Sequence, residues 1–122
     1  MKLVIAGGQP LSRGAVSLLV KTRLGIEDVS EAANYEELMK LVEAVEPDLI
    51  LLDGELSGVN LNEIIATLCG LDHDPSVIVL NERPEMEGAV LAAGADAFIY
   101  KGNNPKQLLI AIEDKRIQRG DH

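Results

Sequence analysis

Short aliphatic runs recur along the chain, and each interval between them is long enough for a helix. They occupy residues 3–6, 29–33, 49–52, 77–80 and 97–100, the second being the weakest. Because these runs are continuous rather than alternating, they suit strands that are buried on both faces of a sheet. Helical crossovers between parallel strands produce that kind of burial. The pattern therefore predicts an α/β fold with a parallel sheet.

The intervals between the runs carry signals for helix ends. Asn34 followed by Glu37 resembles a capping box, and Pro47 should end the same helix. Further signals are Pro84 and Pro105 as first helical residues, Asn104 as a cap, and Gly70 and Gly94 as left-handed helix ends. Five strands and five helices then alternate. Right-handed crossovers favour a doubly wound, five-stranded parallel sheet of order 2-1-3-4-5, the flavodoxin-like (βα)5 arrangement.

The length of 122 residues fits one domain, which we place at 1–119 with a disordered tail at 120–122. The chain is 47% apolar with two tyrosines, one phenylalanine and no tryptophan, so its core must be aliphatic. The one cysteine cannot form an internal disulfide. Because no segment reads as a signal peptide or a membrane span, we expect a cytoplasmic protein.

Eleven basic and twenty acidic residues give a net charge of −9. The excess is concentrated in residues 27–55, which hold ten acids and one base, Lys40. A solvated helix face and ordinary turns account for most of these acids. Such a charge repels phosphate backbones and anionic lipids, so we expect no direct nucleic-acid binding and no membrane contact by this chain.

In a doubly wound sheet, ligands bind beyond the carboxyl ends of the strands. Gly7 and Gly8 follow the first run, Asp53 the third, Asn81 the fourth and Lys101 the fifth. The run before Asp53 is wholly aliphatic, so its carboxylate has little water on that side and needs a partner of opposite charge. Lys101 is the only base that we expect the predicted topology to bring to the same edge.

These segments resemble the receiver domains of two-component response regulators, the CheY-like superfamily, over nearly the whole chain. The resemblance rests on residues 51–58 (LLDGELSG), 98–101 (FIYK) and 5–13 (IAGGQPLSR), the last being similar to receivers of LuxR/NarL-type transcription factors. It implies that Asp53 is the phosphoacceptor and that Lys101 and Asn81 support the phosphoryl group. It also implies that Phe98 is the switch aromatic, although a plain core aromatic is an equal alternative.

The sequence departs from the receiver pattern at several positions. Gly7 and Gly8 replace an acid pair, Ser57 stands where proline is usual, and Asn81 replaces a threonine or serine. In the family the acid pair helps to hold magnesium, which offsets charge during phosphoryl transfer. Here Asp53, water and the carbonyl of Glu55 would form a thin residual site. We therefore expect no resident metal or other cofactor beyond weakly bound Mg²⁺.

With one acid and one base, the charges at the site sum to zero, which predicts a direct ion pair between Asp53 and Lys101. The resulting interpretation is an atypical, non-enzymatic receiver in phosphorelay signal transduction. It would act by binding a protein partner or a histidine kinase, with a homodimer through the fourth helix, fifth strand and fifth helix as one arrangement. Cys69 and His73 have simpler interpretations, a packed thiol and a solvated loop residue.

Three alternatives stay open at this point. In the first, Asp53 still accepts phosphate, and the chain is a fragment of a DNA-binding transcriptional regulator. In the second, the site senses a small anion or a nucleotide. The third is a small hydrolase, for which the sequence offers neither a Ser-His-Asp set nor an H-E-x-x-H pair.

Overall fold

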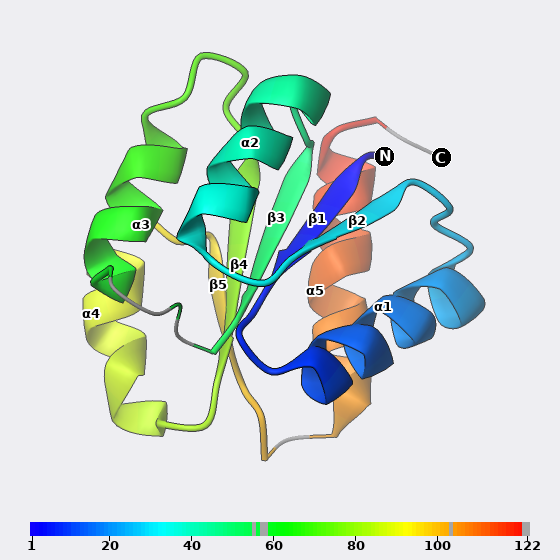
Figure 1. Cartoon of the computed structure of the whole chain (residues 1–122). Coiled ribbons are helices and arrows are strands. Elements are labelled where there is room, and N and C mark those ends of the chain that lie inside the picture. The colour runs from blue at the N-terminus through cyan, green and yellow to red at the C-terminus, as the bar shows by residue number, and fades with distance from the viewer. Residues whose placement is uncertain (55, 57–58, 103, 121–122) are drawn as a thin grey trace.

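The computed structural model describes residues 1–54, 56, 59–102 and 104–120. Its centre is a parallel sheet in the order β2-β1-β3-β4-β5 (Figure 1). The strands are β1 (Leu3–Ala6), β2 (Val29–Ala32), β3 (Leu49–Asp53), β4 (Ser76–Asn81) and β5 (Ala97–Tyr100). The predicted fold class and strand order are therefore confirmed. Because β3 and β4 run slightly beyond the aliphatic runs, Asp53 and Asn81 are the last residues of their strands.

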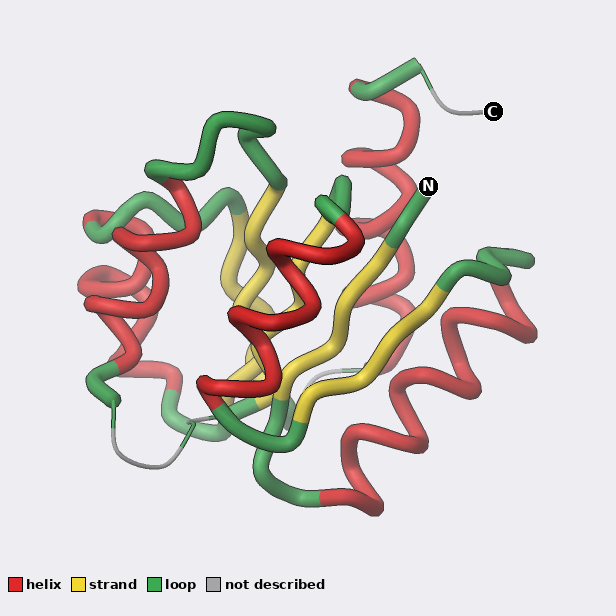
Figure 2. Tube along the Cα trace, turned by 45° about the horizontal axis from the view of Figure 1, so that its top comes forward, coloured by secondary structure: helices red, strands yellow, loops and turns green. Residues whose placement is uncertain are grey.

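Helices cover both faces of the sheet, as the tube in Figure 2 shows from a second side. They are α1 (Pro10–Leu24), α2 (Tyr35–Val45), α3 (Leu61–Cys69), α4 (Glu87–Ala92) and α5 (Pro105–Gln118), with a short 3-10 turn η1 (Pro84–Met86) before α4. One apolar core lies between the sheet and α1 with α5, and the other lies beneath α2, α3 and α4. Among the described residues, no helix is long and apolar enough to cross a bilayer.

The alternation of side chains along the buried strands determines which helices each residue faces. In β3, Leu49 and Leu51 pack in the core under α1 and α5, whereas Ile50 and Leu52 pack under the other helices. Asp53 continues the first series, so it faces α1. The same rule applies to β5, where Ala97 and Ile99 face α1 and α5 and lead on to Lys101. The acid and the base therefore reach the same side of the sheet.

The predicted helix starts are confirmed where side chains act as caps. Asn34 accepts a hydrogen bond from the Glu37 amide at 2.9 Å, and the Glu37 carboxylate accepts one from the amide of Ala33 at 2.9 Å. Ala33 thus belongs to the cap of α2 rather than to β2, where we had predicted it. Asn104 likewise caps α5 through the amide of Lys106.

The helix ends differ from the sequence expectation at one glycine. Gly94 has a positive φ of 119°, as predicted, but Gly70 has a φ of −90° and is not left-handed. Its amide bonds to the carbonyl of Thr67, so α3 closes with a tighter turn that needs no positive φ. Left-handed helix ends that we did not predict occur at Gly25 after α1, with a φ of 66°, and at Glu46 after α2, with a φ of 50°. Of the predicted tail, residues 121–122 lie outside the described residues.

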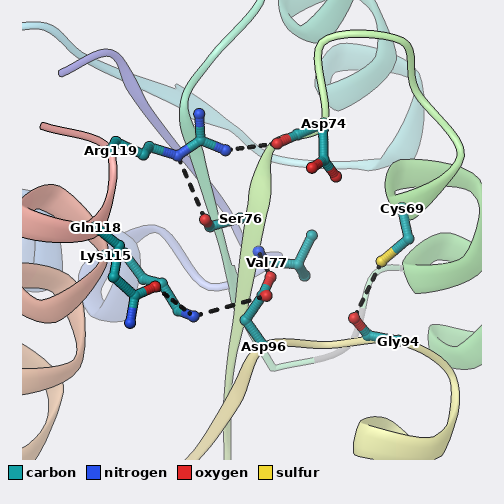
Figure 3. Close-up of polar contacts among 9 residues, drawn as sticks. All are labelled: Cys69, Asp74, Ser76, Val77, Gly94, Asp96, Lys115, Gln118 and Arg119. Carbon is teal, nitrogen blue, oxygen red and sulfur yellow. Dashed lines mark hydrogen bonds and ion pairs between the residues drawn. The ribbon is translucent and has the colours of Figure 1, made fainter.

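Polar contacts join the C-terminal end of α5 to the amino-terminal ends of the strands, at the end of the sheet opposite the ion pair (Figure 3). Arg119 donates to the carbonyl of Asp74 at 2.5 Å, and Lys115 lies 3.7 Å from the carboxylate of Asp96. Asp96 in turn accepts a hydrogen bond from the amide of Val77 at 2.7 Å. These bonds hold the C-terminal end of α5 against the start of β4.

Cys69 is a half-buried thiol at the end of α3. Its Sγ donates to the carbonyl of Gly94 at 3.2 Å (Figure 3). Burial raises the pKa of the thiol above its ordinary value, and the negative charges of Asp96 and Asp74 raise it further. A raised pKa leaves less thiolate at neutral pH, and the thiolate is the nucleophile.

We therefore expect iodoacetamide to alkylate native Cys69 at pH 8 at least about threefold more slowly than the same residue in urea-unfolded protein. Intact mass measured over time gives both rates. Because the chain has one cysteine, each alkylation event reports on this site alone. Equal rates in native and unfolded protein would contradict the burial and charge described here.

Candidate functional site

A buried ion pair lies at the carboxyl end of the sheet. The side chain of Asp53 is 1% exposed, and the Nζ of Lys101 lies 2.7 Å from its Oδ1. The predicted pairing of these two residues is therefore confirmed. Oδ1 accepts no hydrogen bond from the described residues, so its contact with the ammonium group is electrostatic rather than a directed hydrogen bond.

Ser12 joins the pair, and the sequence did not predict it. Its hydroxyl donates to Oδ2 of Asp53 at 2.7 Å and accepts a hydrogen bond from Nζ of Lys101 at 2.9 Å. Ser12 lies in the first turn of α1, whose N-cap residue is Gln9. The alternation along β3, which turns Asp53 toward α1, was the signal that could have identified this helix turn as part of the site.

Gly7 and Gly8 have different surroundings. Gly7 is buried, and a Cβ added to it would lie 2.7 Å from the carbonyl oxygen of Asp53. The close approach of β1 to the end of β3 thus requires glycine there. Arg13 holds this loop by donating to the carbonyl of Gly7 at 2.6 Å while it pairs with Glu31 at 3.0 Å. Gly8 is exposed.

An open pocket of about 280 Å³ lies above the ion pair. It is lined by Gly8, Gln9, Asp53, Gly54, Asn81, Glu82, Arg83 and Lys101. Four of the six predicted site residues therefore share one pocket, and Gly7 lies against the backbone of Asp53 beside it. Gln9 and Glu82 belong to the same loops as the predicted residues. Arg83 is a second base in this pocket, so the expectation that Lys101 is the only base at this edge was wrong.

Asn81 connects the two loops that border the pocket. Its side-chain oxygen accepts a hydrogen bond from the amide of Arg83 at 2.9 Å, and its backbone carbonyl accepts one from the amide of Lys101 at 2.9 Å. The side chain is buried. Because its oxygen is used locally, the amide nitrogen is the end that can donate to an anion in the pocket.

Phe98 lies on β5 beside Val79 of β4. It is half-buried and packs against the core beneath α2, α3 and α4, and it does not line the pocket over the ion pair. This position fits a plain core aromatic, which was one of the two alternatives. A role in switching stays a prediction.

The residues at this site fit a magnesium ion poorly. Of the two oxygens of Asp53, Oδ2 accepts a hydrogen bond from Ser12 and Oδ1 contacts the ammonium of Lys101. Glu82 is exposed at the pocket rim, and Glu55 lies outside the described residues. Across the described chain, no three His, Cys, Asp or Glu side chains come together as a metal-binding group. Magnesium prefers an octahedron of oxygens with one or two carboxylates free to bind it.

Comparison with known families identifies the domain that this fold forms. Residues 3–113 match the response regulator receiver domain. The chain belongs to this receiver family. Receiver domains are regulatory modules that carry phosphoryl-transfer activity and interact with histidine kinases and other proteins. The resemblance inferred from the sequence motifs is thereby confirmed.

Two relatives show which regulators this receiver is similar to. The nitrate/nitrite response regulator protein NarL of Escherichia coli K12 is 31% identical over 112 residues, which cover 90% of this chain and 52% of NarL. The transcriptional regulatory protein BtsR of Salmonella typhi is 30% identical over 122 residues, which cover 100% of this chain and 47% of BtsR. The receiver thus spans about half the length of the curated relatives it matches.

Solved structures agree with the fold. A DNA-binding response regulator of the LuxR family from Staphylococcus aureus superimposes with a TM-score of 0.80 at 25% identity, covering 93% of this receiver and 97% of that chain. The response regulatory domain of mrkE from Klebsiella pneumoniae gives a TM-score of 0.88 at 16% identity, with full coverage of both chains. At that identity, the second likeness concerns the fold alone.

Proposed function

We propose that this chain is an atypical receiver whose site is neutralised by its own lysine and which signals by binding proteins. The observation that carries the proposal is the 2.7 Å contact between Asp53 and Lys101, in a pocket where Gly7 and Gly8 offer no carboxylates. A site with an acid pair would hold three negative charges and one positive charge, a net −2 that a divalent cation balances. Here −1 and +1 sum to zero, so a dication has no charge to offset.

The partner is a histidine kinase or another protein, and the compartment is the cytoplasm. One candidate surface is a homodimer contact through α4, β5 and α5. Several charged side chains on this surface already form ion pairs within the chain, Lys115 with Asp96 and Arg116 with Glu113. Exposed Leu91 and Ile110 supply apolar area on the same helices. Because the chain is negatively charged, we propose no direct contact with nucleic acid or with a membrane.

A second candidate function is phosphorylation of Asp53 itself, which the environment of Oδ1 favours. That oxygen is buried, has lone pairs without a hydrogen bond among the described residues, and belongs to a residue that lines a pocket of about 280 Å³. In the reaction, Oδ1 attacks phosphorus while the donor's P–O or P–N bond breaks, and the leaving group departs with the bonding electrons. Lys101 then stays beside the acyl phosphate. The names and lengths of the similar proteins add the proposal that this receiver is part of a longer, DNA-binding transcriptional regulator.

The two functions are separated by incubating the protein with acetyl phosphate across a magnesium series and measuring intact mass. Under the leading proposal, we expect no adduct that depends on magnesium. An adduct of about 80 Da without magnesium, absent from Asp53→Asn, would favour phosphorylation as the function. An adduct that grows with millimolar magnesium would contradict the proposed neutral site. A thermal shift with phosphate or a nucleotide, without any adduct, would favour the sensor alternative instead.

A further inference from the structure

The Ser12 hydroxyl bridges the ion pair, because it donates a hydrogen bond to Asp53 and accepts one from Lys101. Ser12 is therefore a third member of this site. We propose that Ser12 is a positioning residue that holds the carboxylate of Asp53 and the ammonium of Lys101 in one fixed arrangement. The proposal rests on the proposed function, since it takes the Asp53–Lys101 pair as the working site. It adds a residue to that site and a direction to each of its hydrogen bonds.

The chemistry of a hydroxyl fixes the order of these bonds. Ser12 has one hydrogen to donate, and its 2.7 Å bond to Oδ2 of Asp53 uses it. Lys101 must therefore donate the 2.9 Å bond to Oγ, because an ammonium has no lone pair. Both bonds involve a charged group, and each polarises the next. The result is a directed chain from the ammonium through the hydroxyl to the carboxylate.

Rigid elements hold Ser12 in this position. It follows Pro10 by two residues in the first turn of α1, and the adjacent Arg13 ties that turn to the carbonyl of Gly7 at 2.6 Å. Asp53 is the last residue of a buried strand. The hydroxyl thus lies on a helix and the carboxylate on a strand, so neither group of this hydrogen bond is carried by a loop.

The hydrogen bond from Ser12 determines which oxygen of Asp53 is left without a hydrogen bond. Rotation of the carboxylate would break the bond from Ser12 to Oδ2, so Oδ1 remains the oxygen next to Lys101 without a hydrogen bond from the described residues. Ser12 also lines a second, mostly apolar pocket of about 230 Å³ between α1 and α5, which Lys101 borders as well. Without the hydroxyl, the lysine side chain would gain freedom to move toward that pocket.

The test uses proton exchange at the ammonium group of Lys101, followed by NMR in protein labelled with ¹⁵N-lysine and without any phosphodonor. In Ser12→Ala, we expect exchange at least about tenfold faster than in the parent, because one charge-assisted hydrogen bond is lost. Ser12→Thr keeps a hydroxyl and should restore slow exchange. Ser17→Ala is the matched control, since Ser17 is buried in the same helix away from the pair.

Parent-like exchange in Ser12→Ala, or equal acceleration in Ser17→Ala, would overturn the assignment. This measurement needs no phosphoryl transfer, so it can fail or succeed independently of the proposed function. If acetyl phosphate labels the parent, Ser12→Ala should be labelled about tenfold more slowly at saturating donor, with the KM for acetyl phosphate unchanged. A change confined to KM would show that Ser12 binds the donor rather than positions Asp53, and would also overturn the proposal.

Discussion

Replacing Lys101 by methionine is expected to lower the free energy of unfolding by about 3 kcal/mol at pH 7. The substitution keeps most of the volume of the side chain and removes its charge. Asp53, which is 1% exposed, would then keep a buried carboxylate with the hydroxyl of Ser12 as its polar contact among the described side chains. An uncompensated buried charge is among the largest single destabilising effects in proteins. Urea unfolding followed by far-UV circular dichroism measures the loss.

Lys115 provides the matched control for this substitution. Its side chain is 19% exposed, the same fraction as that of Lys101, but its partner Asp96 is 36% exposed and lies 3.7 Å away. Because water screens that pair, Lys115→Met should cost less than about 1 kcal/mol. If the two lysine variants lose equal stability, the buried ion pair does not have the energetic weight assigned to it.

A double variant distinguishes the energy of the Asp53–Lys101 interaction from the contribution of each residue by itself. Asp53→Asn combined with Lys101→Met leaves no buried charge at the site, so the double variant should recover at least about 1 kcal/mol relative to Lys101→Met. The recovery measures the coupling between the two side chains. Additive losses would mean that Lys101 stabilises the fold through its aliphatic stem rather than through its charge.

The fold and the ion pair were predictable because they depend on short-range regularities. Continuous aliphatic runs indicate parallel strands, and parallel strands bring their carboxyl ends to one edge, where Asp53 and Lys101 follow their runs. Period-two alternation then turns both residues toward α1. None of these steps requires knowledge of how a helix is rotated about its own axis.

Ser12 was missed for the opposite reason. Which side of α1 faces the end of β3 depends on the packing of Val16 and Val20 in the core, and a rotation of the helix would turn the hydroxyl away. A serine in the first turn of a helix is also typical of capping, which hides any other role. Glu46 is a different case, because Pro47 disfavours the right-handed helical conformation at the preceding residue. That signal was available in the sequence and places the end of α2 before Pro47, but it favours extended backbone, so it does not predict the left-handed conformation of Glu46.

The second large effect is expected at Gly7. Gly7→Ala should lower the free energy of unfolding by about 2 kcal/mol, because its Cβ would lie 2.7 Å from the carbonyl oxygen and 3.1 Å from the Cβ of Asp53. Both atoms belong to a buried strand end, so neither can move aside as the tip of a flexible side chain would. Thermal and urea unfolding would report the loss.

Gly14→Ala is the control with the opposite sign. Gly14 is half-buried within α1, and a Cβ added to it would meet nothing within 4 Å. Alanine is the better helix former by about 1 kcal/mol, so this variant should be more stable than the parent. The two glycine substitutions should therefore differ by about 3 kcal/mol in unfolding free energy. A Gly7→Ala protein as stable as Gly14→Ala would show that β1 and β3 separate at little cost.

The same contact limits any attempt to rebuild an acid pair. An aspartate at position 7 carries the Cβ that meets the backbone of Asp53, whereas position 8 is exposed and borders the pocket. Gly8→Asp should therefore fold like the parent, while Gly7→Asp should lose at least as much stability as Gly7→Ala, about 2 kcal/mol. If both aspartates were tolerated equally, a change of side chains alone would restore the acid pair. If they differ as expected, the close approach of β1 to β3 is itself part of what distinguishes this receiver.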